Sequence, residues 1–97
     1  MHDPTTTAEI ARLRERIDAV DTRLAELLEQ RALLAARVQR LKPVGYFAGR
    51  DADREHGLVR RMAEHAPRLG ADRLAAIMNR VITAGLSAAR EEADRGR

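Results

Sequence analysis

Two basic side chains near the end of the first forty-odd residues could together bind a small anion. Arg31 falls where the surrounding pattern calls for an apolar residue, and a charge in an apolar seam is costly unless it is paired. Lys42 follows eleven residues later. On a helix this spacing puts both side chains on nearly the same side, about 16 Å apart along the axis. We expect the two side chains to bind one small ligand. The alternative is that Arg31 fixes the register of the helix against a partner helix, as polar seam residues do in coiled coils.

Lys42 is also unusual for its type. The chain has 18 basic residues, and Lys42 is the only lysine among them. In a chain that otherwise uses arginine, this exception points to a role that needs an ammonium group, or else to a drift in composition.

A second group of charges lies at residues 50–55, Arg-Asp-Ala-Asp-Arg-Glu. Asp51 can cap a helix, and Glu55 gains from the positive end of that helix. Arg54 lies at the unfavourable end of the dipole, so it is less easily explained as a helix-stabilising residue. These three residues are candidates for a binding site, and a solvated surface is the alternative.

Several kinds of chemistry find no support in the sequence. There is no cysteine, and His56 and His65 are nine residues apart, which does not place them on one helical face. We find no glycine-rich phosphate loop and no pairing of a nucleophile with a base. We therefore expect neither a metal nor a cofactor.

The first helix is predicted from a heptad seam that ends before Pro43. Thr6 and Glu9 have the spacing of a capping box, which makes Thr6 the N-cap and residues 1–5 a frayed tail. Spacings of three and four alternate along the seam, with position 31 as the one interruption, through Ile10, Leu13, Ile17, Val20, Leu24, Leu27, Leu34, Val38 and Leu41.

This helix would be about 50 Å long. Its apolar seam needs a cover, and two copies packed together would supply one. We therefore expect an intertwined homodimer, with a single elongated three-helix hairpin as the alternative.

Two shorter helices are predicted to follow a loop at residues 43–50. Asp51 caps the second helix, whose apolar face carries Leu58, Val59, Met62 and Ala66 before Pro67 and Gly70 break it. The third begins at about Asp72, and the tail from Glu91 to the end is expected to fray. Its apolar face carries Leu74, Ile77, Met78, Val81, Ile82, Leu86 and Ala89. The expected fold is all-α, in a single domain over residues 1–97.

Composition limits the partners. The net charge is +3, but the 18 basic and 15 acidic residues are interspersed. That argues against a continuous nucleic-acid-binding stripe and favours a small acid as the ligand. No apolar run is long enough to span a membrane, and the first residues lack the features of a secretory signal. We expect a cytoplasmic protein that binds neither nucleic acid nor membrane.

Four motifs, in order, resemble those of the AroQ class of chorismate mutases. Residues 13–21, LRERIDAVD, are similar to the family's LRxxIDxxD, and residues 27–31, LLEQR, are similar to its LLxxR. Lys42 stands where the family has a helix-ending lysine, and residues 50–55, RDADRE, are similar to RDxxRE. The resemblance covers roughly residues 10–90.

The resemblance implies two three-helix chains wound together, with two active sites that rearrange chorismate to prephenate. It implies that Arg31 binds one substrate carboxylate and that Arg14 of the other chain binds the second. Lys42 would donate to the ether oxygen, Asp51 and Glu55 would hold the substrate hydroxyl, and Arg54 would help to organise the site.

Helix geometry favours the same shared site. Arg14 and Arg31 are seventeen residues apart, about 25 Å along one helix. They cannot reach one small ligand within a chain, so a common ligand requires a partner.

The third helix departs from the family pattern. Gly85 and Ala89 occupy substrate-site positions where the family usually has Ser and then Gln or Glu. The absent Gln or Glu normally makes a second contact to the ether oxygen. The neighbouring Arg90 is not a direct replacement, because it lies about 100° round the helix from Ala89.

Alternatives therefore stay open. One is 4-amino-4-deoxychorismate mutase, because Asp51 and Glu55 would suit an ammonium group. Another is isochorismate-pyruvate lyase, against which the acidic motif counts. A third is a non-catalytic helical dimer that regulates another aromatic-pathway enzyme.

Overall fold

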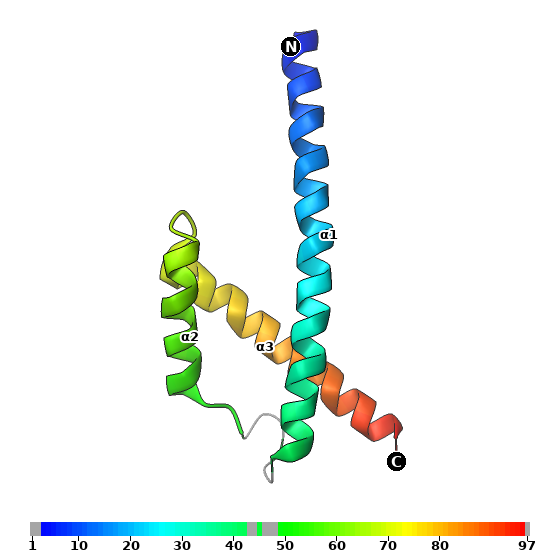
Figure 1. Ribbon diagram of the computed structural model, residues 1–97, viewed down its shortest axis with the longest axis vertical. Helices are drawn as coiled ribbons and strands as arrows, with labels where there is room; N and C mark the ends of the chain where they lie inside the picture. The colour runs from blue at the N-terminus through cyan, green and yellow to red at the C-terminus, as the bar shows by residue number, and fades with distance from the viewer. Residues whose placement is uncertain (1–2, 43–44, 46–48, 97) are drawn as a thin grey trace. The chain divides into compact units, whose positions relative to one another are not determined.

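The computed structural model describes residues 3–42, 45 and 49–96, and these residues form three helices. They are α1, Pro4–Leu41; α2, Ala52–His65; and α3, Gly70–Arg95 (Figure 1). The described residues contain no strand. The prediction of an all-α fold, with one long helix followed by two shorter ones, is confirmed. No helix within the described ranges has both the length and the apolar character needed to cross a membrane.

The chain divides into two compact units, Met1–Gln30 and Arg31–Arg97. The first holds the N-terminal part of α1, and the second holds the last turns of α1 together with α2 and α3. That all 97 residues act as one domain stays a prediction.

The start of α1 differs from the prediction. Asp3, not Thr6, caps the helix: the Thr6 amide donates to Asp3 Oδ1 at 2.9 Å, and the Thr7 amide donates to the Asp3 carbonyl at 3.0 Å. Pro4 then occupies the first helical position, where its fixed φ suits the helix and its missing N–H is no loss. The predicted frayed tail is therefore wrong for residues 3–5, and residues 1–2 lie outside the described part of the chain.

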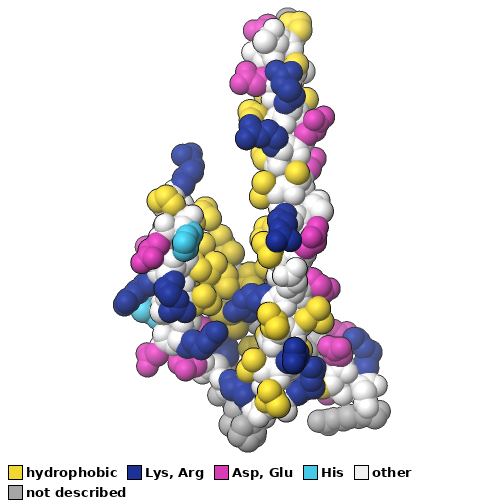
Figure 2. Space-filling model, in the orientation of Figure 1, with side chains coloured by type: hydrophobic (Ala, Val, Ile, Leu, Met, Phe, Trp, Pro, Cys, Tyr) yellow, Lys and Arg dark blue, Asp and Glu magenta, His cyan; other side chains and the backbone are white. Residues whose placement is uncertain are grey.

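In the unit Met1–Gln30, the apolar seam of α1 is largely exposed. Leu13 is 47%, Ile17 56% and Val20 65% exposed. Figure 2 shows yellow apolar side chains interspersed with charged ones along this part of α1. An exposed stripe of this kind is typical of a helix that packs against another chain.

The unit Arg31–Arg97 holds a small buried core. α2 packs against α3, and the buried side chains there are Ala36 of α1 and Leu74, Met78, Leu86 and Ala89 of α3. The residues predicted to form the apolar face of the second helix are all half-buried. They are Leu58, Val59 and Met62 of α2 and Ala66, which follows it.

One residue of the predicted core face lies outside it. Ile77 is 46% exposed, while its neighbour Met78 is buried. Adjacent helical residues are separated by about 100°. The buried spine of α3 runs through Leu74 and Met78, and Ile77 falls at its edge.

The boundaries of α2 and α3 follow local backbone chemistry. Asp51 caps α2 as predicted, with its side chain accepting from the Arg54 amide. α2 ends at His65, before the predicted breakers Pro67 and Gly70, while α3 begins at Gly70 rather than at about Asp72, with φ of Gly70 at +77°. That backbone region suits glycine because it has no Cβ. Of the predicted loop at 43–50, only Gly45, Gly49 and Arg50 lie within the described residues.

The C-terminal end of α3 also corrects the sequence interpretation. The helix continues to Arg95 rather than fraying from Glu91, and Arg95 Nη1 lies 3.3 Å from Glu91 Oε1. Pairs of this kind, four residues apart on an exposed helix, add modest stability. A basic residue at the C-terminus also suits the helix dipole.

Candidate functional site

A pocket of about 370 Å³ lies within the unit Arg31–Arg97. The last turns of α1, the start of α2 and the middle of α3 form its walls. Its charged lining residues are Arg31, Lys42, Arg50, Asp51, Arg54 and Glu55, and its apolar ones include Leu34, Val38, Ile82 and Leu86. Four basic groups against two acidic ones leave an excess of two positive charges. A pocket with this balance suits a small dianion.

Lys42 is the first residue after α1. The helix ends one residue before it, and its Nζ donates to the Gly49 carbonyl at 2.7 Å. This bond ties the ammonium group to the chain that leads into α2. Lys42 therefore lines the pocket from the end of α1 and is hydrogen-bonded to the segment that precedes α2.

Asp51 already has a structural task. Its Oδ1 accepts from the Arg54 amide at 3.0 Å, so its carboxylate caps α2. A carboxylate at this place also interacts favourably with the helix dipole. The same bond fixes the first turn of α2, from which Arg54 and Glu55 reach the pocket.

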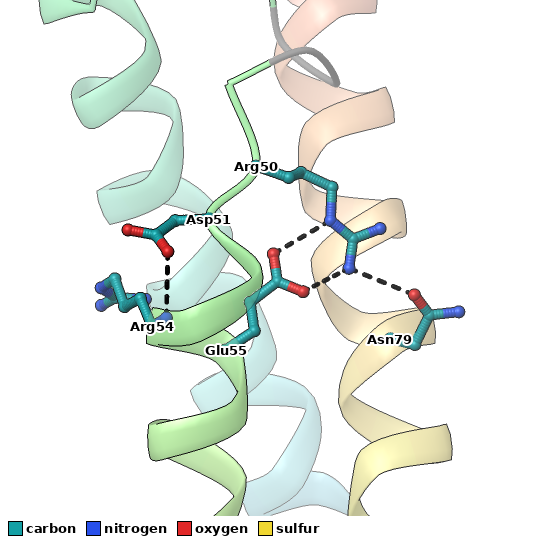
Figure 3. A network of polar contacts seen from close by, with 5 residues as sticks. All are labelled: Arg50, Asp51, Arg54, Glu55 and Asn79. Carbon is teal, nitrogen blue, oxygen red and sulfur yellow. Dashed lines mark hydrogen bonds and ion pairs between the residues drawn. The ribbon is translucent and has the colours of Figure 1, made fainter.

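Glu55 is held by Arg50 in a two-pronged ion pair (Figure 3). Arg50 Nε donates to Glu55 Oε2 at 3.0 Å, and Arg50 Nη2 donates to Oε1. The same Nη2 donates to Asn79 Oδ1 at 3.1 Å, which links the start of α2 to α3. The Arg50 and Glu55 side chains are 27% and 22% exposed, so water screens the pair only in part.

This pairing shifts the titration of both groups. The hydrogen bonds from Arg50 hold the pKa of Glu55 below its usual value, against a smaller opposing effect of burial, and Arg31 nearby acts in the same direction as Arg50. The pairing with Glu55 raises the pKa of Arg50. Glu55 is therefore an ionised acceptor at neutral pH.

The structure brings together five of the residues predicted from the sequence. Arg31, Lys42, Asp51, Arg54 and Glu55 all line the one pocket. These residues are up to twenty-four positions apart in the sequence.

The other three predicted residues lie elsewhere. Arg14 is an exposed residue of the unit Met1–Gln30. Gly85 and Ala89 are buried in α3, but Ile82 and Leu86 are the α3 residues that line the pocket. A role for Arg14, Gly85 and Ala89 at a substrate stays a prediction.

The sequence did not predict the structural importance of three polar residues, Arg50, Asn79 and Gln39. Arg50 was visible as the first letter of the RDxxRE motif, but nothing in the spacing revealed its bond to Asn79, twenty-nine residues away. Gln39 was hidden because it lies between seam positions. It lines the pocket, and its buried Oε1 has no hydrogen-bond partner among the residues that the structure describes.

The arrangement can bind and polarise a small acid. Arginine forks suit carboxylates, and a lysine ammonium suits a single oxygen on which charge develops. Within residues 3–42, 45 and 49–96 there is no cluster of His, Cys, Asp or Glu that could hold a metal ion. The polar groups in the pocket suit positioning and electrostatic stabilisation.

Comparison with known families gives one result. The sequence matches the family model described as chorismate mutase type II over residues 13–90. No curated protein and no solved structure matches the chain.

Proposed function

We propose that this chain, which belongs to the type II chorismate mutase family, rearranges chorismate to prephenate as a homodimer with shared active sites. The observation that carries the proposal is the pocket in which Arg31, Lys42 and Glu55 meet with an excess of positive charge. A dicarboxylate with one ether oxygen and one hydroxyl group matches those three kinds of side chain. We place the reaction in the synthesis of aromatic amino acids or of related metabolites.

The reaction needs positioning rather than a nucleophile. Chorismate rearranges within one molecule as the C–O ether bond breaks and a C–C bond forms. The enzyme has to hold the folded conformer and stabilise the negative charge that grows on the ether oxygen. In our proposal Arg31 binds one carboxylate, Lys42 donates to the ether oxygen, and Glu55 accepts from the hydroxyl group.

The second carboxylate would be bound by Arg14 of the partner subunit. Arg14 and Arg31 lie on one continuous helix, and their seventeen-residue separation corresponds to a rise of about 25 Å. No small substrate spans that distance. A partner chain would supply its own Arg14 to the pocket of the first.

Two apolar surfaces support the dimer. The seam of α1 is exposed at Leu13, Ile17 and Val20. A second pocket of about 270 Å³ between α2 and α3 has apolar lining residues such as Val59 and Met78 beside polar ones, and it shares Glu55 and Ile82 with the first pocket. Burial of exposed apolar surface is the main driving force for most protein association.

The hydroxyl substrate fits better than the amine. An ammonium group would need a free carboxylate, but Asp51 caps α2 and Glu55 is paired with Arg50. The RDxxRE motif at residues 50–55 counts against the lyase activity. We therefore favour chorismate over aminodeoxychorismate and isochorismate.

The test is incubation of the purified chain with chorismate, isochorismate and 4-amino-4-deoxychorismate, with products identified by NMR. We expect prephenate from chorismate, and its formation should depend on Lys42. The Lys42→Ala variant is the matched control for contaminating activity. Turnover of none of the three compounds would overturn the proposal and favour a non-catalytic dimer that regulates another aromatic-pathway enzyme. Gly85 and Ala89, which stand in place of the usual Ser and Gln or Glu, would be consistent with that outcome.

A further inference from the structure

We infer that Arg50 sets the specificity of the pocket, so that the site selects a dicarboxylate bearing a neutral hydroxyl group over one bearing an ammonium group. This inference rests on the proposed function, and it assigns to Arg50 a role that goes beyond holding the fold.

Arg50 engages both oxygens of Glu55, through Nε to Oε2 and through Nη2 to Oε1 (Figure 3). A carboxylate has about four lone-pair directions. The fork occupies two, and the remaining two can still accept hydrogen bonds from a ligand.

A ligand that enters the pocket meets several fixed charges. Arg50 already balances the charge of Glu55, so a neutral hydroxyl group finds an acceptor without having to neutralise it. An ammonium group at the same place would lie close to the Arg50 guanidinium. It would also enter a pocket that already has two more basic than acidic lining residues. Like charges at a partly desolvated site repel strongly.

A residue of α3 also helps to keep Arg50 in place. Arg50 Nη2 donates to Asn79 Oδ1 on α3 at 3.1 Å. The guanidinium is thus fixed from two helices, and its side chain is only 27% exposed. A cation held in this way repels an incoming cation more effectively than a flexible surface arginine would.

The lowered pKa of Glu55 agrees with this role. Hydrogen bonds from Arg50 are its largest cause. Glu55 therefore stays ionised and acts only as an acceptor, which is what a donating hydroxyl group requires. Removing Arg50 would take away the cation that is hydrogen-bonded to Glu55, and an ammonium group could then occupy its place.

The experiment compares kcat/KM for chorismate and for 4-amino-4-deoxychorismate in the full-length protein. In the wild-type chain we expect chorismate to be preferred. In Arg50→Met we expect the ratio of the two kcat/KM values to shift toward the amine by about tenfold or more, since one opposite charge at close range favours a cation by that order. Arg68→Met removes one exposed arginine from the connection between α2 and α3 and should leave the ratio unchanged.

A second variant guards against misfolding of Arg50→Met. Asn79→Asp keeps the side-chain shape, competes with Glu55 for Arg50 and adds a negative charge. It should shift the ratio in the same direction by a smaller factor, about threefold. Circular dichroism would show that each variant remains helical.

The outcomes separate the inference from the proposed function. If Arg50 is only structural, both substrates lose kcat/KM equally, the ratio stays constant in Arg50→Met, and the inference is overturned while the function stands. If the wild-type chain turns over neither compound, the proposed function fails and the inference fails with it. A tenfold shift in Arg50→Met with no shift in Arg68→Met supports both.

Discussion

The two acidic residues at the start of α2 have different tasks although they are four residues apart. Asp51 uses its carboxylate to cap the helix, and Glu55 uses both oxygens to bind Arg50. Their environments therefore decide their chemistry more than their type does. Glu55 is paired with Arg50, which also donates to Asn79, and Arg31 and Asp51 are close enough to affect the titration of Glu55.

This pairing predicts a pH dependence of stability. The pKa of Glu55 in the folded chain is lowered, so the unfolded chain binds its proton more tightly. The stabilisation is therefore present above the unfolded pKa, near 4.5, and is lost as the pH falls through the lower folded value. Glu55→Gln should lower the free energy of unfolding at pH 7 and have a smaller effect at pH 3, measured by denaturant unfolding.

Glu64→Gln is the matched control for that experiment. Glu64 is an exposed residue of the same helix with no ion pair in the described part of the chain. Its substitution should change stability little at either pH. An effect of Glu55→Gln that is the same at pH 7 and pH 3 would contradict the assigned pairing.

Lys42 should matter mainly in the transition state, because the charge on the ether oxygen develops only as the bond breaks. Lys42→Ala should lower kcat by about 10²–10³-fold, the usual cost of one such donor, with a much smaller change in KM. Steady-state kinetics on chorismate measures both. Lys42→Arg, which keeps the charge but not the point-like ammonium, should recover only part of the loss. An unchanged kcat in Lys42→Ala would remove Lys42 from the mechanism.

Spacing along the sequence predicted which residues share a helix face. Contacts between residues of different elements depend on tertiary packing, and the spacing did not predict them. Arg31 and Lys42 could be placed on one side of the predicted first helix by counting turns, and both line the pocket. The contact between Arg50 and Asn79 joins residues on different elements. No periodicity encodes that contact, because it depends on how α2 packs against α3.

At the scale of elements, the helices themselves were predictable and their ends were not. The seam and the amphipathic faces predicted three helices because apolar residues recur with the helical period. The ends depend on single residues that compete for the same backbone groups. Asp3 caps α1 in place of the predicted Thr6. At the other end of the chain, α3 extends beyond its predicted end and includes the Glu91–Arg95 ion pair.

Gly70 gives the clearest prediction at this scale. It starts α3 with φ at +77°, a region that costs an L-residue about 1–2 kcal/mol. Gly70→Ala should therefore lower the free energy of unfolding by about that amount, although a Cβ there would meet no atom within 4 Å. Denaturant unfolding monitored by circular dichroism measures it.

Gly57→Ala is the matched control, with the opposite expected sign. Gly57 lies inside α2, and a Cβ there would meet only Arg61 Nη1, the end of a flexible side chain, at 3.4 Å. Alanine in a helix interior is favoured over glycine by about 0.5–1 kcal/mol, so this variant should be more stable. Equal effects of the two substitutions would mean that the backbone at Gly70 is not the cause.

At the scale of the whole molecule, the proposed dimer connects two separate observations. The seam of α1 has large apolar residues exposed, and Arg14 is too far along the helix to share a ligand with Arg31. Covering the seam with a second copy would also bring a second Arg14. The sequence could predict the need for a partner from helix length, but the way in which two chains pack depends on surfaces that no single-chain pattern specifies.

The central claim is a shared active site that rearranges chorismate, and one mixing experiment tests it most directly. Arg14→Ala and Arg31→Ala chains should each be nearly inactive on chorismate. Mixed in equal amounts and exchanged by unfolding and refolding, half of the dimers would be heterodimers, each with one intact site. The mixture should then recover about one quarter of wild-type activity, as random pairing of a two-fold dimer requires. A mixture no more active than either variant alone would contradict the shared site.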